Sequence, residues 1–119
     1  MKKLLFLFAF TLFFISCEKH QDFLIPNSEV PVWLKAKIAH DENVIESSPQ
    51  SGLEISAWIR YKWDGKYFFE YRNGFSSLGP EKFNYDGDKI MLNQEPYLNF
   101  EAEKCCKEIV WKTTAYIDY

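Results

Sequence analysis

Two stretches in the middle of the chain alternate between apolar and polar side chains. Between residues 53 and 63 the odd-numbered positions are apolar, and most of the even-numbered ones are polar. After Asp64-Gly65 a second alternating run covers residues 66 to 72. Alternation with a period of two is typical of half-buried strands, and Asp-Gly is a turn signal. The pattern therefore predicts an antiparallel β-hairpin, around which the rest of the domain is organised.

The register of this hairpin decides which side chains share a face. A two-residue loop of Asp64 and Gly65 would set Ile59 opposite Glu70, which mixes apolar and charged groups on one face. A three-residue loop that also includes Trp63 avoids this mixture, with Gly65 in the left-handed position of a bulged turn. We therefore predict the longer loop. The expected cross-strand pairs are Tyr61 with Tyr67, Ile59 with Phe69, and Ala57 with Tyr71.

The predicted register leaves aromatic and charged side chains on the face away from the core. Trp and Arg are enriched at binding hot spots, and flat aromatic rings beside charges suit stacking against sugars. The same residues also form ordinary cross-strand pairs, and a second layer of structure over this face would make them part of the core. The candidate ligand-binding residues are Trp58, Arg60, Phe68 and Glu70.

A helix is expected before the hairpin. Pro31 suits the first turn of a helix, and apolar residues at positions 30, 33, 34, 38 and 45 fall near one helical face. The helix should end near Glu46, before a run of turn-forming residues. After the hairpin we expect a short second hairpin around Asp86-Gly87 and a last antiparallel strand over residues 108 to 119.

These elements predict an α+β fold, in which one N-terminal helix packs on a four- to five-stranded antiparallel sheet. An all-β sandwich or a small barrel is the alternative.

The beginning of the chain has the pattern of an export signal. Lys2 and Lys3 precede an apolar run over residues 4 to 15, which is shorter than the roughly 20 residues of a membrane-spanning helix. The stretch Phe14-Ile15-Ser16-Cys17 resembles the lipobox of bacterial lipoproteins. This resemblance implies cleavage before Cys17, lipidation of Cys17 and attachment of the mature chain to a membrane. The alternative is an ordinary secretory signal with an incidental cysteine.

Cleavage at that point leaves a small acidic chain. Removal of residues 1 to 16 takes away two lysines and no acids, and changes the formal charge from −3 to −5. We expect residues 17 to 29 to be the lipidated cysteine with a tether, and residues 30 to 119 to be a single globular domain. Because the chain has no cluster of lysine or arginine, its charge gives no indication of nucleic-acid binding.

Few residues are arranged for catalysis or metal binding. A partial calcium-loop pattern has Lys89 where such a loop needs glycine, and no zinc-ligand spacing is found. His20 and His40 are not evidently placed to activate a nucleophile. We therefore expect no catalytic residue, no metal and no cofactor. The adjacent Cys105 and Cys106 leave three alternatives open, which are a vicinal disulfide, two thiols, or intermolecular pairing.

Three features together resemble short uncharacterised lipoprotein domains of Gram-negative bacteria. They are Pro31-Val32-Trp33-Leu34, the hairpin rich in Tyr and Phe, and the adjacent cysteine pair. The resemblance implies a location and an architecture but no activity. We expect an exported, non-catalytic lipoprotein, anchored by lipid at the outer membrane of the cell envelope, that binds an envelope protein or a ligand such as a glycan. The alternative is a small hydrolase that acts on glycan or cell-wall substrates.

Overall fold

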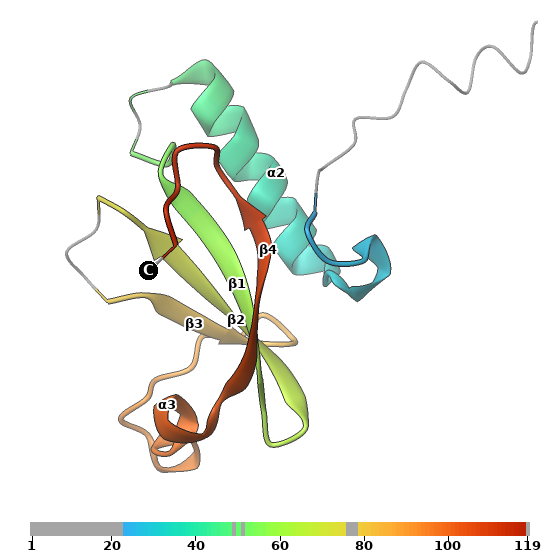
Figure 1. The fold of residues 1–119 in the computed structure, drawn as a ribbon, viewed down its shortest axis with the longest axis vertical. Helices are drawn as coiled ribbons and strands as arrows, with labels where there is room; N and C mark the ends of the chain where they lie inside the picture. Colours follow the sequence, from blue (N-terminus) through green and yellow to red (C-terminus); the bar gives the residue numbers. More distant parts are fainter. Residues whose placement is uncertain (1–22, 49, 51, 76–78, 119) are drawn as a thin grey trace, which may run out of the picture.

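One long helix packs against an antiparallel sheet of four strands in the computed structural model, which describes residues 23–48, 50, 52–75 and 79–118 (Figure 1). The strands are β1 (Ser56–Trp63), β2 (Lys66–Asn73), β3 (Glu81–Asn84) and β4 (Cys105–Lys112), and their order in the sheet is β3-β2-β1-β4. The helical elements are η1 (Asn27–Glu29), α2 (Val32–Ser47), η2 (Glu95–Tyr97) and α3 (Phe100–Glu103). The predicted α+β class and the antiparallel sheet are confirmed.

Helix α2 forms where its apolar residues recur on one face, as predicted. Leu34 and Ile38 are fully buried against the sheet, and burial of each such side chain contributes about 1.5–3 kcal/mol. The Pro31 carbonyl accepts the first helical hydrogen bonds. Trp33 donates its indole N–H to the Tyr85 carbonyl at 2.7 Å, which ties the helix to the turn after β3.

That turn must bring its backbone close to the helix. Gly87 has φ of +93°, and a Cβ atom there would lie 3.0 Å from the Trp33 ring. Both the conformation and the close contact therefore favour glycine at this position.

The hairpin turn contains two residues, Asp64 and Gly65, and Trp63 pairs directly with Lys66. Both central residues have positive φ, 51° and 73°, as a type I′ turn requires. The predicted three-residue loop is therefore wrong, and every cross-strand pair shifts by one residue. The observed pairs include Trp58 with Tyr71, Ile59 with Glu70, Arg60 with Phe69, and Tyr61 with Phe68.

This register places the core on the side of β1 that the prediction had left open, while Phe69 of β2 faces the core as predicted. Trp58 and Phe69 lie under α2, and their rings are 6.0 and 5.8 Å from the ring of Trp33. The buried cluster between helix and sheet consists of Ile25, Val30, Leu34, Ile38, Trp58, Phe69, Phe83, Val110 and Trp111.

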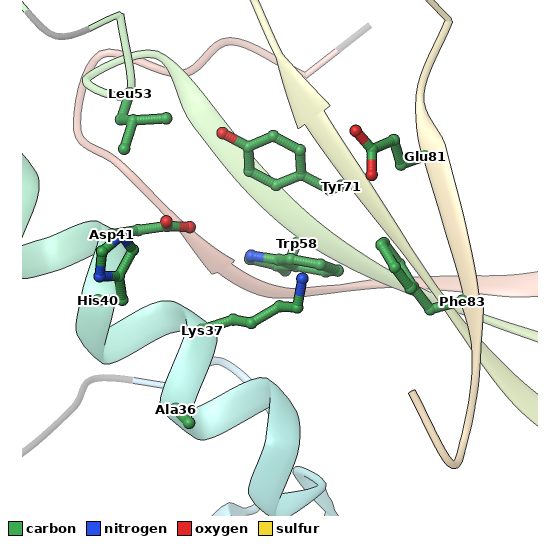
Figure 2. A pocket seen from close by; sticks show the side chains of 9 residues that line it. All are labelled: Ala36, Lys37, His40, Asp41, Leu53, Trp58, Tyr71, Glu81 and Phe83. Carbon is green, nitrogen blue, oxygen red and sulfur yellow. The ribbon is translucent and has the colours of Figure 1, made fainter. Parts of the chain in front are cut away.

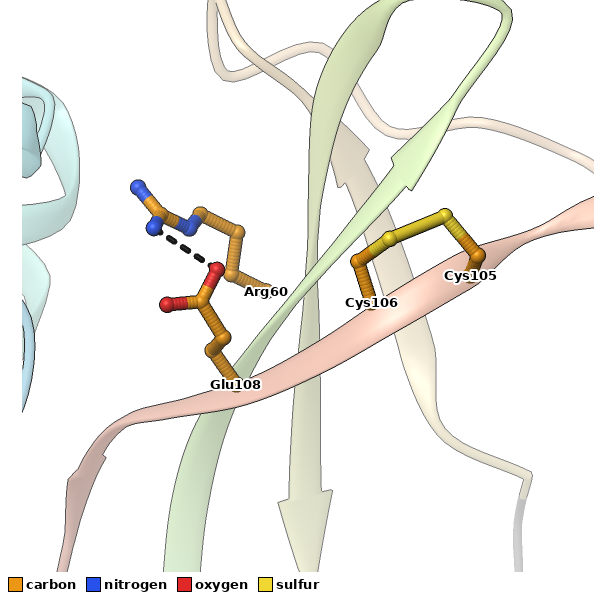
Figure 3. The surroundings of a disulfide bond; sticks show 4 residues. All are labelled: Arg60, Cys105, Cys106 and Glu108. Atoms are coloured by element: carbon orange, nitrogen blue, oxygen red, sulfur yellow. Dashed lines mark hydrogen bonds and ion pairs between the residues drawn. A yellow bond between two sulfur atoms is a disulfide. The ribbon is translucent and has the colours of Figure 1, made fainter.

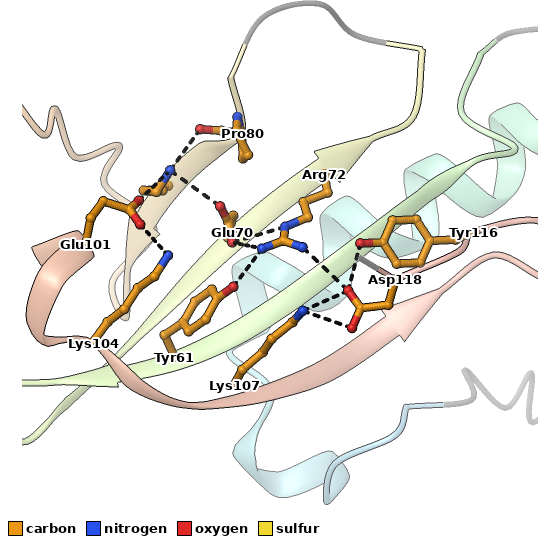
Figure 4. Close-up of polar contacts among 10 residues, drawn as sticks. Tyr61, Glu70, Arg72, Pro80, Glu101, Lys104, Lys107, Tyr116 and Asp118 are labelled. Atoms are coloured by element: carbon orange, nitrogen blue, oxygen red, sulfur yellow. Dashed lines mark hydrogen bonds and ion pairs between the residues drawn. The ribbon is translucent and has the colours of Figure 1, made fainter.

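The opposite face of the sheet carries a buried ion-pair network (Figure 4). Glu70 lies beside the apolar Ile59, and its carboxylate contacts Arg72 at 3.3 Å and Lys82 at 3.4 Å. The same Arg72 reaches Asp118, while Lys82 reaches Glu101 at 3.1 Å. A buried charge is tolerated when it is paired. Because Glu70 has these partners, the shorter turn can place it on the same face as Ile59.

Aromatic side chains cover the turn end of that same face. Phe68 and Phe100 are buried with their rings 5.2 Å apart, and Trp63 packs 5.7 Å from Phe100. Phe100 comes from α3, which lies near the β1–β2 turn (Figure 1). This face is therefore covered by a second, smaller cluster at one end and by ion pairs at the other.

The last strand begins and ends earlier than predicted. Strand β4 stops at Lys112, and the chain then turns so that Tyr116 and Asp118 lie over the ion-pair network. The antiparallel pairing of β4 with β1 agrees with the prediction.

The predicted second hairpin is reduced to β3 and a single bridge between Phe83 and Lys89. The Asn84 side-chain oxygen accepts hydrogen bonds from the N–H groups of Asp86 and Asp88, which stabilises a turn there.

Residues 23 to 25, which the sequence had placed in the tether, pack on the domain. Ile25 belongs to the core, and the Leu24 N–H donates to the Val110 carbonyl at 2.8 Å. That hydrogen bond and the apolar contact together hold the segment against β4.

The tight turn gives a direct test of the register. Gly65 has φ of +73° and open space around it, so Gly65→Ala tests only the backbone conformation. The left-handed region costs a residue with a Cβ atom roughly 1–2 kcal/mol, and we expect the free energy of unfolding to fall by that amount. Gly79→Ala is the control, since Gly79 also has open space but no positive φ. Equal denaturation midpoints for the two variants would contradict the type I′ turn.

Candidate functional site

The four residues predicted to form an exposed binding face are buried and do not share a face. Trp58, Arg60 and Glu70 are each 3% exposed, and Phe68 is 5% exposed. Trp58 and Arg60 lie on the side of α2, whereas Phe68 and Glu70 lie on the opposite side, because the two-residue turn shifts β2 by one position. The prediction of one open face is therefore wrong.

Arg60 is held in place by its neighbours. Its guanidinium donates to Glu108 at 2.8 Å (Figure 3). The guanidinium also lies 4.2 Å from the centre of the Tyr67 ring. A second carboxylate, that of Glu29, is 3.9 Å away. These contacts join β1, β2, β4 and the segment before α2, so Arg60 has a structural role at the covered end of the sheet.

A cleft of about 470 Å³ opens between α2 and the strands β1 to β3 (Figure 2). Helix α2 supplies Lys37, His40 and Asp41 along one side. The opposite side is formed by Tyr71 of β2 together with Glu81 and Phe83 of β3, and Trp58 of β1 lies between the two sides. This volume is within the roughly 300–1,000 Å³ that is usual for small-molecule sites.

Trp58 is the centre of this cleft. Its ring lies 5.1 Å from that of Tyr71 and 5.6 Å from that of Phe83, so the three form a connected aromatic surface. The indole nitrogen is buried and makes no hydrogen bond of good geometry to the described residues, although it interacts with the Asp41 carboxylate closely enough to lower the pKa of that group. A buried donor without an acceptor is costly, typically about 1–3 kcal/mol, and is rare in native proteins.

The carboxylate of Asp41 points toward this indole nitrogen (Figure 2). Burial raises the pKa of Asp41 above its ordinary value of 3.8, although the nearby indole and the charges of His40 and Lys37 act in the opposite direction. A partly desolvated carboxylate in a cleft is a common feature of functional sites.

Sequence reasoning identified one residue of this cleft, Trp58, and assigned it to the wrong surroundings. The other residues come from α2, from the segment before β1, and from β2 and β3, which are far apart in the chain. In the sequence, the signal for this cleft was the polar pair His40 and Asp41 near the polar edge of the predicted helix. That pair became informative only once the register had placed Trp58 and Tyr71 beneath it.

A second hollow of about 360 Å³ lies at the turn end of the sheet, between Tyr67, Tyr85 and Tyr97. None of the residues that line it has a buried polar atom without a hydrogen bond. The cleft at Trp58 is therefore the stronger candidate for a site with specific polar recognition.

Cys105 and Cys106 form a vicinal disulfide at the start of β4 (Figure 3). The sequence had left three alternatives open for these cysteines, and the structure contains the vicinal disulfide. Both residues are exposed, and Cys106 has φ of +65°. The pairing of β4 with β1 shifts register between Arg60 and Lys62, opposite this region. The disulfide therefore coincides with an irregularity at the edge of the sheet.

Cys17, the predicted lipidation site, and the leader before it lie outside the described residues. Within the part of the chain that the structure does describe, no helix is both long and apolar enough to cross a bilayer. The same residues bring together no group of three His, Cys, Asp or Glu side chains suited to hold a metal ion. Comparison with protein-family models, curated proteins and solved structures finds no match to the chain.

The raised pKa of Asp41 predicts how its removal changes stability. The folded state holds the Asp41 proton more tightly than the unfolded state, because burial disfavours the ionised carboxylate. The free-energy cost of burying the ionised Asp41 is therefore absent below pH 3.8, where the group is protonated in both states, and develops as the pH rises through the pKa of the folded state. Asp41→Asn should therefore raise the melting temperature at neutral pH and lose this advantage in acid. Glu46→Gln, at an exposed position of the same helix, controls for the loss of one negative charge. A lower melting temperature for Asp41→Asn at neutral pH would show that the Asp41 charge stabilises the fold.

Proposed function

We propose that this chain is a non-catalytic lipoprotein of the bacterial envelope that binds a ligand in the cleft between α2 and the sheet. The observation that carries the proposal is the buried indole N–H of Trp58, which makes no hydrogen bond of good geometry and lies beside the partly desolvated carboxylate of Asp41. Stability alone would favour a satisfied donor and a solvated acid at these positions. The free-energy cost of the buried indole donor and of the desolvated carboxylate is explained if a ligand supplies the missing interactions.

The arrangement of the cleft supports binding of a small molecule. Its sides come from a helix and a sheet that are fixed to each other by the aromatic contacts of Trp33, so the site is formed before any ligand arrives. Preformed sites avoid the entropic cost of ordering side chains on binding.

Lipidation of Cys17 would hold this domain close to a membrane, and we propose the outer membrane as its location. Attachment that is stable needs two or more acyl chains, since a single chain binds only marginally. Phe23, the first residue that the structure describes, lies six positions after Cys17. An extended chain spans at most about 3.5 Å per residue, so this separation is no more than roughly 20 Å. The domain would then lie close to the membrane surface and to the ligands found there.

The anchor is tested by expressing the full chain and its Cys17→Ser variant in a Gram-negative host. We expect the unmodified chain in the membrane fraction, with an intact mass that includes acyl groups and lacks residues 1 to 16. Cys17→Ser should lose the acyl mass and leave the membrane fraction. A soluble product of the original sequence with a free Cys17 thiol would contradict the proposal.

The binding function is tested by filling the cleft. Ala36 is an exposed residue of α2 that lines it, so Ala36→Trp should block access while leaving the core unchanged. Val32→Trp is the matched control, because Val32 is 82% exposed on the same helix and does not line the cleft. A ligand raises the melting temperature in proportion to its occupancy.

We expect the small-molecule fraction of an envelope extract to raise the melting temperature of the original chain and of Val32→Trp, but not of Ala36→Trp. Equal shifts for all three proteins would place binding elsewhere. No shift for any of them would count against a small-molecule binding function.

A further inference from the structure

The two polar groups at the centre of the cleft have opposite requirements. The Trp58 indole N–H can only donate a hydrogen bond, and the ionised carboxylate of Asp41 can only accept one. The carboxylate points toward the indole and interacts with it, but the pair lacks the geometry of a good hydrogen bond. A single atom that accepts from the indole and donates to the carboxylate would satisfy both groups. Among common ligand groups, a hydroxyl has this property.

Charged ligand groups fit these surroundings less well. An ammonium group has no lone pair to accept the indole hydrogen bond, and Lys37 already lies 5.0 Å from the centre of the Phe83 ring, where a cation would otherwise sit. An anion could accept from the indole and would be attracted by Lys37, but it would meet the Asp41 carboxylate beside the indole. Like charges at such short range disfavour binding.

The remaining surface suits a molecule with several hydroxyl groups and an apolar side. Tyr71, which is half-buried, presents aromatic surface, against which the C–H groups of a sugar ring can pack. Lys37 supplies donors and Glu81 supplies acceptors at the rim of the cleft. Both kinds of partner are therefore available to further hydroxyl groups.

We infer that the cleft binds a neutral polyhydroxyl ligand, a mono- or disaccharide, one hydroxyl of which bridges the Trp58 indole N–H and the Asp41 carboxylate. This inference rests on the proposed ligand-binding function and specifies the chemistry of the ligand. It assigns Trp58 as a binding residue through its nitrogen and its ring edge, since the ring itself is almost completely buried.

The test follows the Trp58 indole N–H by nuclear magnetic resonance of the isotope-labelled full chain in detergent. The probes are glucose, N-acetylglucosamine and maltose as neutral sugars, with choline and inorganic phosphate as charged comparisons. We expect at least one sugar to shift the Trp58 indole signal with saturation, and neither charged probe to do so.

Two variants test the bridge itself. Trp58→Phe keeps an aromatic ring but removes the N–H, and we expect the Kd for that sugar to rise roughly three- to tenfold, as for the loss of one hydrogen bond. Trp63→Phe is the matched control, because the Trp63 indole donates to Glu103 on the other face of the sheet, and its Kd should not change. If Trp58→Phe does not fold, Asp41→Asn takes its place and should raise the Kd similarly without any loss of stability.

Each outcome decides the inference. Saturable sugar binding that depends on Trp58 or Asp41 supports it. Binding of choline or phosphate without sugar binding overturns the assigned ligand class and leaves the binding function standing. Failure of every probe to move the Trp58 signal overturns the inference too, with water then bridging the two groups. In that case the cleft-filling variants show separately whether the binding function also fails.

Discussion

The tight turn at Asp64 and Gly65 determines which side chains of the hairpin meet helix α2. Because side chains alternate along a strand, a turn shorter by one residue moves every side chain of β2 relative to β1. With both turn residues at positive φ, Trp58 and Phe69 face the helix, and Ile59 and Glu70 face away. The core, the buried ion pairs and the cleft all follow from this one choice.

The cleft exists because the same register places Trp58 at the boundary between covered and open sheet. Helix α2 lies over one side of the Trp58 ring, and Tyr71 and Phe83 pack on the other. The indole nitrogen therefore ends beside Asp41 at the edge of the core, next to the cleft. On the far face, ion pairs of Glu70 with Arg72 and Lys82 stabilise a charge that would otherwise oppose this register.

Periodicity predicted the elements well, since the spacing of Leu34, Ile38 and their neighbours fixes the buried side of α2 without knowledge of the rest of the fold. The register could not be predicted in the same way. The rule that apolar and charged groups avoid one face excluded the correct turn, because the cations that pair with Glu70 could not be located from the local pattern. The cleft depends on contacts between α2, β1, β2 and β3, so only the three-dimensional structure shows that Asp41 faces Trp58.

The register of the hairpin is tested most directly by the nuclear Overhauser contacts of the ring protons of Trp33. The ring of Trp33 lies 6.0 Å from that of Trp58 and 5.8 Å from that of Phe69, so cross-peaks from Trp33 to both rings are expected. Ile59 lies on the opposite face of the sheet and should give none. Cross-peaks from Trp33 to Ile59, with none to Trp58, would show that the hairpin has the other register and would contradict the account.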